Sequence, residues 1–238
     1  MVDYFINFIT ILAVGFYTIT TLQWYNYKIE RVITKFVKYQ WHILYFILPV
    51  ATYYLGGKFY WIYLFFGVIP ALFIWYKKLD KKLVFTSRVK RFFGLLIFLT
   101  LISYLFDYYF QTPKGVFLPI ILTIIGSEII ERIIFNGYKK QALKKLNEIN
   151  PKIITITASY GKTSIKNFIY QLLENHFNSY KTPRSVNTLK GIVADINNNL
   201  KENTDIYIVE AGARERGDIK EIAEFLNHQY VEALFFQQ

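Results

Sequence analysis

The chain has 238 residues, enough for one or two domains, and its 53% hydrophobic content, with 20 Tyr and 22 Phe, is too high for an ordinary soluble domain. It contains no cysteine, which excludes disulfides, thiolate catalysis and cysteine-type zinc sites. The net charge of +11 raises nucleic acid as a partner, but the basic residues gather between hydrophobic segments. Membrane topology explains that placement better, so we expect a lipid bilayer as partner and no nucleic acid.

Most of the apolar residues lie in the region 1–137, which is predicted to be a membrane anchor. Its apolar stretches approach the roughly 20 residues that a helix needs to cross a bilayer. Tyr and Trp gather at the ends of the stretches, as they do at membrane interfaces. The second stretch is short and the fifth carries charge, so four or five spans are possible. The predicted spans are Tyr4–Gln23, Trp41–Gly56, Phe59–Tyr76, Phe92–Phe110 and Val116–Phe135.

The charge of the connecting segments predicts how the spans are oriented across the membrane. The first and third connectors and the segment after the fifth stretch are rich in Lys and Arg, whereas the second and fourth carry only Lys58 and Lys114. Basic connectors stay in the cytoplasm. The alternation favours five spans with the N-terminus outside. We therefore expect a multi-pass protein of the bacterial cytoplasmic (inner) membrane, with its C-terminal domain in the cytoplasm.

The fifth predicted span carries Glu128, Glu131 and Arg132. Glu128 and Arg132 stand four residues apart and can pair on one helix face, which lowers the cost of charge in lipid. An ion or substrate path is one interpretation. The simpler one, which we favour, is that the helix leaves the bilayer at this point. The helical region then serves as an anchor.

The remainder of the chain has the pattern of an α/β domain. Residues 138–151 are predicted to be a polar linker, and residues 152–238 to be the first part of an ATP-binding domain. Buried strand patterns and amphipathic helix patterns alternate there, which is typical of a parallel sheet. The predicted strands are Lys152–Thr157, Asn178–Lys181 and Asp205–Ala211, and the predicted helices are the segment after Lys162, Leu189–Leu200 and Asp218–Leu226.

A phosphate-binding loop is predicted where the first strand ends. Gly161-Lys162-Thr163-Ser164 stands between that strand and a helix, so backbone N–H groups and the helix N-terminus can face a phosphate. The strict motif requires a glycine where the chain has Ile156, so an ordinary turn with an exposed lysine stays open. In the functional interpretation Lys162 neutralises phosphate charge and the Thr163 hydroxyl reaches Mg²⁺. Glu210, at the end of a buried strand, is positioned to serve a second Mg²⁺.

Three segments together resemble the central ATPase domain of the Mur ligase family. They are Thr157–Ser164, Lys181–Gly191 and Val209–Ile219, in family order. The family pattern Gly-x-x-Gly-Lys-Thr-Thr/Ser has Ala158 in place of its first glycine here. The resemblance implies ATP and Mg²⁺ as cofactors, with Lys162 and Glu210 as catalytic residues, and Thr163 and Glu210 holding metal. It also implies a substrate loop with Ser185, Asn187 and Thr188, and a nucleotide loop formed by Ala158, Ser159, Tyr160, Gly161, Lys162, Thr163 and Ser164.

The resemblance implies ATP-dependent amide formation in peptidoglycan precursor synthesis. A D-Ala-D-Ala dipeptide or a similar amino substrate would be added to a UDP-MurNAc peptide through an acyl phosphate. The chain lacks the later family segments, so we expect an incomplete form, a fragment or the product of a shifted reading frame, and leave open whether it is an active enzyme. The alternative is a non-catalytic membrane scaffold that retains a nucleotide-binding half-domain. The fold class expected is membrane helices followed by a partial α/β P-loop sheet.

Overall fold

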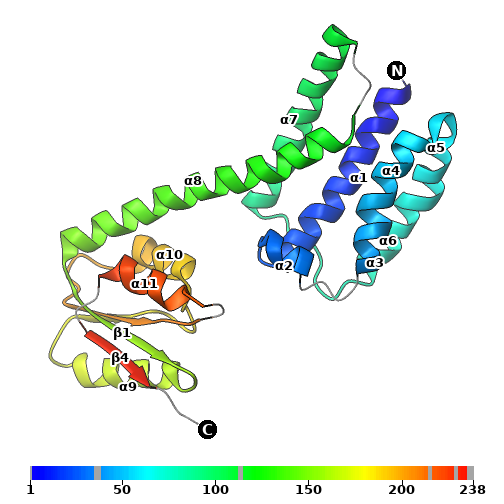
Figure 1. Cartoon of the computed structure of the whole chain (residues 1–238). Helices are drawn as coiled ribbons and strands as arrows, with labels where there is room; N and C mark the ends of the chain where they lie inside the picture. The colour runs from blue at the N-terminus through cyan, green and yellow to red at the C-terminus, as the bar shows by residue number, and fades with distance from the viewer. Residues whose placement is uncertain (1, 35–38, 112–114, 214–215, 228–229, 235–238) are drawn as a thin grey trace. The chain divides into compact units, whose positions relative to one another are not determined.

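The computed structural model describes residues 2–34, 39–111, 115–213, 216–227 and 230–234. The chain divides into two compact units, residues 1–131 and 132–238, and each is described by itself. The first is helical and the second is an α/β unit with a parallel sheet (Figure 1). This order confirms the expected fold class. Lys114, counted in the connector charges, lies outside the described residues.

The helical unit is built around α1 (Val2–Trp24), whose buried residues include Ile11 and Val14. A helical stretch from Tyr39 to Leu55 runs through α3, η1 and α4, and a second from Gly57 to Lys77 runs through η2, α5, η3 and α6 (Figure 1). The remaining helices are α2 (Ile29–Thr34), α7 (Ser87–Phe110) and α8 (Phe117–Ile149), of which α8 continues into the second unit.

Two π-helical segments interrupt the long stretches, η1 (Ile43–Ile47) before α4 (Leu48–Leu55) and η3 (Tyr63–Val68) before α6 (Ile69–Lys77). Each following helix has a proline in its first positions, Pro49 and Pro70. Proline has no N–H and its ring clashes with the carbonyl four residues earlier. A locally wider turn relieves that clash, so the helix continues past each proline.

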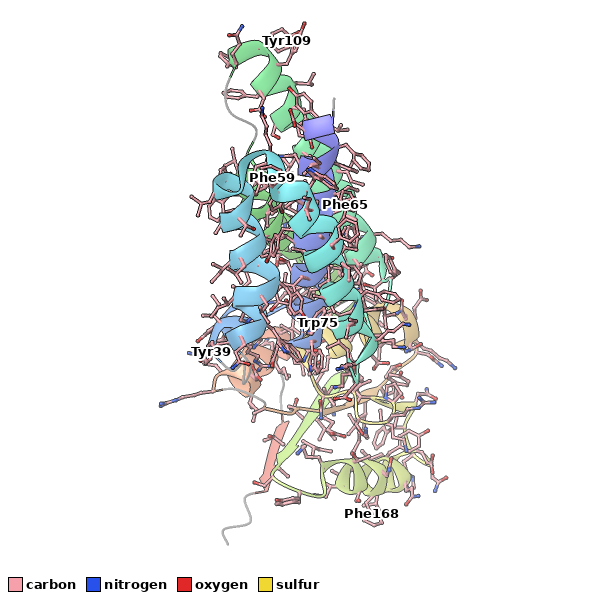
Figure 2. The ribbon with its side chains drawn as sticks, turned by 90° about the vertical axis from the view of Figure 1, so that its right-hand side faces the viewer. Tyr39, Phe59, Phe65, Trp75, Tyr109 and Phe168 are labelled. Carbon is pink, nitrogen blue, oxygen red and sulfur yellow. The ribbon has the colours of Figure 1, made fainter. Side chains whose placement is uncertain are left out.

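Three helices of the described chain are long and apolar enough to cross a membrane, Asp3–Trp24, Gly57–Lys77 and Ser87–Phe110. They overlap three of the five predicted spans; the count of five stays a prediction. In Figure 2, Tyr39 of the stretch Tyr39–Leu55 and Trp75 of the stretch Gly57–Lys77 lie near the same end of these two helical stretches, and Phe59 lies near the other end. Large apolar side chains are widely exposed on this unit, Phe66 and Tyr109 among them.

The charged residues of α8 contact a neighbouring helix. Arg88 of α7 donates to Glu128 at 3.0 Å, and Arg91 of α7 donates to Glu131 through Nε at 2.8 Å and Nη2 at 2.5 Å. The Arg88 guanidinium also lies 3.8 Å from the centroid of the Tyr27 ring. Pairing across two helices, which the sequence did not indicate, joins α7 to α8 in the first unit.

The α/β unit contains a four-stranded parallel sheet in the order β2-β3-β1-β4. The strands are β1 (Lys152–Ala158), β2 (Ser179–Lys181), β3 (Ile206–Glu210) and β4 (Tyr230–Leu234). Helix α9 (Lys162–Leu173) covers one face, and α10 (Leu189–Asn199) and α11 (Asp218–Leu226) cover the other (Figure 1). Glu210 pairs in register with Ile156, so the ends of β3 and β1 share one edge of the sheet.

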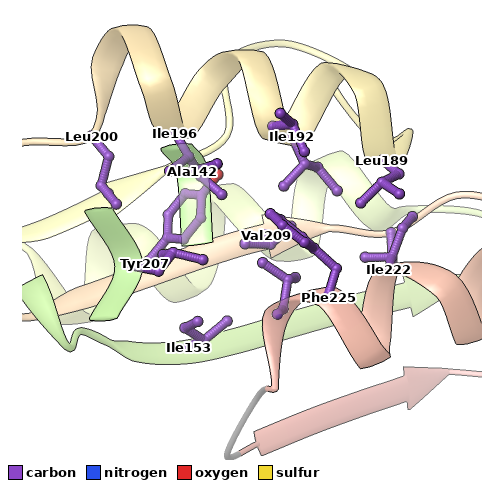
Figure 3. Packing of buried hydrophobic residues seen from close by; sticks show 14 residues of the cluster. Ala142, Ile153, Leu189, Ile192, Ile196, Leu200, Tyr207, Val209, Ile222 and Phe225 are labelled. Atoms are coloured by element: carbon purple, nitrogen blue, oxygen red, sulfur yellow. The ribbon is translucent and has the colours of Figure 1, made fainter. Parts of the chain in front are cut away.

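The main core lies between the sheet and the helices α10 and α11. Ile192, Ile196, Tyr207 and Val209 are buried there (Figure 3). The last turns of α8 add Ala142 and Leu146 to the same core. Residues 138–149, predicted to be a linker, are therefore helical and packed, because their apolar positions recur at helical spacing.

Helix α9 differs from its predicted amphipathic pattern. Ile165, Ile169 and Leu173 pack on the sheet, but Phe168 is 64% exposed and Leu172 is 74% exposed. Both residues fit the same helical stripe in sequence, so periodicity alone places them inside. The structure therefore buries only part of the predicted apolar stripe.

A polar cluster supports the edge strand β2. Asp195 of α10, 4% exposed, accepts hydrogen bonds from Tyr180 of β2 at 2.8 Å, Tyr207 of β3 at 3.0 Å and Asn199 at 2.9 Å. Burial, followed by the charge of Asp195, raises the pKa of Tyr207 well above 10. Burial and the hydrogen bond to Asp195 raise the pKa of Tyr180 in the same way. Both phenols therefore remain neutral donors at neutral pH.

Candidate functional site

The predicted phosphate loop lies at the sheet edge where β1 ends. Residues Ser159–Gly161 form the turn and α9 begins at Lys162. Gly161 has φ of +75°, a left-handed conformation that glycine adopts without strain. Tyr160 is 75% exposed on the turn. Strand, turn and helix N-terminus therefore follow in the order that a phosphate loop requires.

The Lys162 ammonium folds back over its own turn. Its Nζ donates to the Ala158 carbonyl at 2.5 Å and lies 3.5 Å from the Ser159 carbonyl. The family resemblance implies Lys162 and Glu210 as catalytic residues, with Lys162 on phosphate and Glu210 on metal. In the structure, the lysine that contacts Glu210 is Lys166, one turn further along α9.

Glu210 is the centre of the site and is 2% exposed at the end of β3. Its Oε2 accepts from the Thr163 hydroxyl at 2.9 Å and from Lys166 Nζ at 3.2 Å. Its Oε1 accepts from Asn187 Nδ2 at 3.2 Å. The fold thus joins Thr163 and Glu210, the two residues predicted to hold metal, although 47 positions separate them in the chain.

The loop after β2 brings Asn187 to Glu210. The Thr182 hydroxyl accepts from the Glu210 backbone N–H at 3.2 Å, which ties the start of the loop to β3. The Asn187 carbonyl accepts from Gly212 N–H at 2.8 Å. Thr188 caps α10, its hydroxyl accepting from Gly191 N–H at 3.3 Å, and Ser185 is exposed. In the part of the chain that the structure describes, Asn187 is the one predicted substrate residue whose side chain contacts the Glu210 carboxylate.

Gly212 makes the approach of Asn187 possible. A Cβ added at Gly212 would lie 2.8 Å from Asn187 Cγ and 2.9 Å from Nδ2. Any larger residue would push the amide away from Glu210. Close packing therefore explains why small residues, Ala211 and Gly212, follow the buried acid Glu210.

A cavity of about 360 Å³ opens beside this cluster. Its lining joins α9 to the strand and loop that follow it, and it carries three cations. The lining residues are Thr163, Lys166, Asn167, Tyr170, Tyr180, Lys181, Thr182, Pro183 and Arg184. Lys181 Nζ donates to Asn167 Oδ1 at 2.8 Å and lies 4.2 Å from the centroid of the Tyr170 ring. A larger hollow of about 600 Å³ near Lys144 and Asn197 contains none of the predicted site residues.

The residues at the sheet edge fit a magnesium ion. The Thr163 hydroxyl and the Glu210 carboxylate are hard oxygen ligands lying side by side, and Mg²⁺ is commonly held by one or two carboxylates together with phosphate oxygens and water. No group of three or more His, Cys, Asp or Glu forms a metal cluster in the part of the chain that the structure describes.

Comparison with known proteins shows which family the α/β unit is similar to. The family model for the Mur ligase middle domain matches residues 156–232. The second unit therefore carries a Mur ligase middle domain, and the resemblance found in the sequence is confirmed for that part of the chain. The first unit lies outside the match.

The similar proteins within this family are UDP-N-acetylmuramoyl-tripeptide–D-alanyl-D-alanine ligases. The enzyme of Rickettsia prowazekii (strain Madrid E) is 30% identical over 92 residues, 39% of this chain and 20% of the relative. That of Bacillus subtilis (strain 168) is 29% identical over 82 residues, 34% of this chain and 18% of the relative. The solved MurF ligase from Thermotoga maritima in complex with ADP is 32% identical, with a TM-score of 0.36, over 38% of this chain and 21% of that one. The chain spans about a fifth of the length of the curated relatives it matches.

Lys166 is the site residue that the sequence analysis missed. It follows Thr163 by three positions, so both lie on one face of α9. Its position between the apolar residues Ile165 and Ile169 was the available signal, because a lysine within a buried stripe requires a partner.

Proposed function

We propose that this chain is a membrane-anchored, ATP-dependent amide ligase of peptidoglycan precursor synthesis. The observation that carries the proposal is the contact of Thr163 with Glu210 at 2.9 Å, beside a phosphate-type loop, within a Mur ligase middle domain. The substrates proposed are a UDP-MurNAc peptide and an amino acid or dipeptide such as D-Ala-D-Ala, since the similar ligases are named for that addition.

In the proposed reaction the substrate carboxylate oxygen forms a bond to the γ-phosphorus of ATP while the bond from that phosphorus to the bridging oxygen breaks and ADP leaves. The amine nitrogen then attacks the acyl carbon, phosphate departs, and the nitrogen loses its proton to give the amide. The chemistry needs stabilisation of phosphoryl charge above all. Lys162 and the N–H groups of the turn supply it, and Mg²⁺ held by Thr163 and Glu210 would add further positive charge.

The membrane part of the proposal rests on composition and length. The helical unit has three helices that could cross a bilayer and a widely exposed apolar surface. A bilayer would cover that surface. Anchoring in the bacterial cytoplasmic membrane, with the α/β unit in the cytoplasm, would hold the ligase where ATP is available.

The first prediction tests nucleotide binding by the full chain in lipid nanodiscs. Lys162→Ala removes a charge-assisted phosphate contact, and such hydrogen bonds contribute about 1.5–3 kcal/mol, so we expect binding of a fluorescent ATP analogue with Mg²⁺ to weaken about 10- to 100-fold. Lys220→Ala is the matched control, because Lys220 is an exposed lysine of α11 that pairs with Glu224. Equal affinity of the Lys162→Ala variant and the wild type would remove the phosphate loop from the proposal. No binding by either would contradict the proposed function.

A further inference from the structure

The lysine at the centre of the site is almost completely buried. Lys166 is 1% exposed and its partner Glu210 is 2% exposed. The Lys166 ammonium donates to Glu210 Oε2 at 3.2 Å and also to the backbone carbonyl of Arg184. A single cation therefore joins α9, the end of β3 and the loop after β2.

Stability alone is a weak reason for such an arrangement. Removing two charges from water costs several kcal/mol per ion, and apolar residues of similar volume often serve as well or better. Arg184 adds a second cost, since its φ of +48° is left-handed and a residue with a side chain is strained there. The carbonyl of this strained residue is the second acceptor for Lys166. Two unfavourable features thus meet at one contact, as they do at functional sites.

The two groups that accept hydrogen bonds from Lys166 belong to segments that carry predicted site residues. Glu210 is the predicted metal ligand, and Arg184 precedes Ser185 and Asn187 in the predicted substrate loop. Lys166 also lines the 360 Å³ cavity beside Thr163, so the contact forms part of a cavity wall. With Lys166 and Thr163 on Oε2 and Asn187 on Oε1, the Glu210 carboxylate is held by both of its oxygens.

We propose that Lys166 is a positioning residue that fixes the Glu210 carboxylate and the loop 182–188 relative to each other. One ammonium sets the separation of the acid and the loop, so Asn187 meets one carboxylate oxygen while Thr163 meets the other. The purpose of this alignment rests on the proposed function: Glu210 faces the Mg²⁺ of the nucleotide and the loop faces the acyl substrate. The alignment itself is a property of the chain and can be tested without a ligand.

The first test measures amide hydrogen exchange in the full chain carrying Lys166→Met. Loss of a charge-assisted hydrogen bond corresponds to roughly 10-fold or more in local opening, so exchange at residues 182–188 and at Gly212 should accelerate by about that factor. Exchange in β1 and α11 should stay as in the wild type. Lys220→Met, which removes an exposed lysine of α11, is the matched control. Unchanged exchange in the loop would overturn the proposal.

The second test uses a fluorescent ADP analogue with Mg²⁺ or with EDTA. Loss of a residue that orients a metal ligand lowers metal affinity about 10- to 100-fold, so the gain in affinity on adding Mg²⁺ should fall by that factor while affinity in EDTA stays the same. A merely structural lysine would lower both affinities together, and that result contradicts the proposal. If the wild type binds no nucleotide, the proposed function fails, and loop exchange still decides the role of Lys166.

A further variant covers the case in which Lys166→Met does not fold. Lys166→Met with Glu210→Gln removes both charges at once, which avoids a buried unpaired carboxylate. In that double variant we expect the global fold to persist and the loop 182–188 to exchange faster than in the wild type. Protection of the loop at the wild-type level would show that Lys166 does not hold it.

Discussion

At the residue scale, the site is defined by one buried carboxylate with three side-chain donors. Glu210 accepts hydrogen bonds from Thr163 and Lys166 of α9 and from Asn187 of the loop 182–188, and both segments are distant from Glu210 in the sequence. Thr163 and Glu210 could be inferred from the sequence because a loop motif and a strand-end acid each have a local pattern. The contacts of Lys166 and Asn187 could not, since they depend on the spacing of α9 and the loop above the sheet edge.

The Asp195 cluster gives a prediction for pH. The pKa of Tyr207 lies well above 10 in the folded chain, because of burial and the neighbouring charge of Asp195, whereas an unfolded tyrosine titrates near 10. Below pH 10 both states keep the proton, and stability does not change. Above pH 10 only the unfolded state releases it, so stability falls as pH rises, by up to about 1.4 kcal/mol per pH unit.

Tyr207→Phe separates this effect from other groups. The variant loses the 3.0 Å hydrogen bond to the Asp195 carboxylate and should be about 1.5–3 kcal/mol less stable at pH 8. Its stability should then decline less steeply than that of the wild type between pH 10 and pH 11. Tyr180, whose pKa is also raised, donates to the same Asp195 carboxylate and is present in both chains. Scanning calorimetry of the two full chains would measure this, and parallel slopes would contradict the assignment.

At the scale of elements, the hydrophobic pattern predicted the helices and strands of the α/β unit well but not which side of α9 is covered. Periodicity shows that a helix has an apolar face, but the tertiary packing decides how much of that face is buried. Phe168 and Leu172 are exposed, while Ile165 and Ile169 are packed. The end of α8 shows the reverse case. Its many lysines suggested a linker, but Ala142 and Leu146 on one face pack on the core.

The difference between covered and uncovered faces can be tested with two truncations. Ile192 of α10 is fully buried, and Ile192→Ala should destabilise the α/β unit by about 2–5 kcal/mol through lost burial and the cavity left behind. Leu172→Ala removes a similar apolar side chain that is 74% exposed on α9, and should change stability by no more than about 0.5 kcal/mol. Calorimetry under the same conditions would compare them. Equal losses would place Leu172 in a core that the structure does not give it.

At the scale of the whole molecule, the chain combines an apolar helical unit with a Mur ligase middle domain. The topology of the helical unit is a prediction from connector charge. The identity of the second unit could be inferred because three motifs follow one another in family order. The number of spans could not be fixed in the same way, because Tyr39–Leu55 is short and α8 carries charge.

The topology can be tested by cysteine labelling, since the natural chain has no cysteine. A maleimide that does not cross membranes should label Lys58→Cys in intact cells, because this weakly charged connector is predicted to lie outside. Lys81→Cys and Lys201→Cys should be labelled only after lysis. All three lysines are exposed in the structure, so access within the protein does not limit the reaction. Labelling of Lys58→Cys and Lys81→Cys from the same side would contradict the predicted orientation.

The aromatic packing of the helical unit has an optical consequence. Each of the four tryptophans, Trp24, Trp41, Trp61 and Trp75, lies in that unit, and the rings of Trp41 and Trp75 are 5.6 Å apart beside Tyr17 and Tyr45. Tryptophan fluorescence therefore reports on the helical unit, and the α/β unit contributes no signal to it. Quenchers dissolved in lipid or in water can then show, without any attached dye, which medium surrounds the helices.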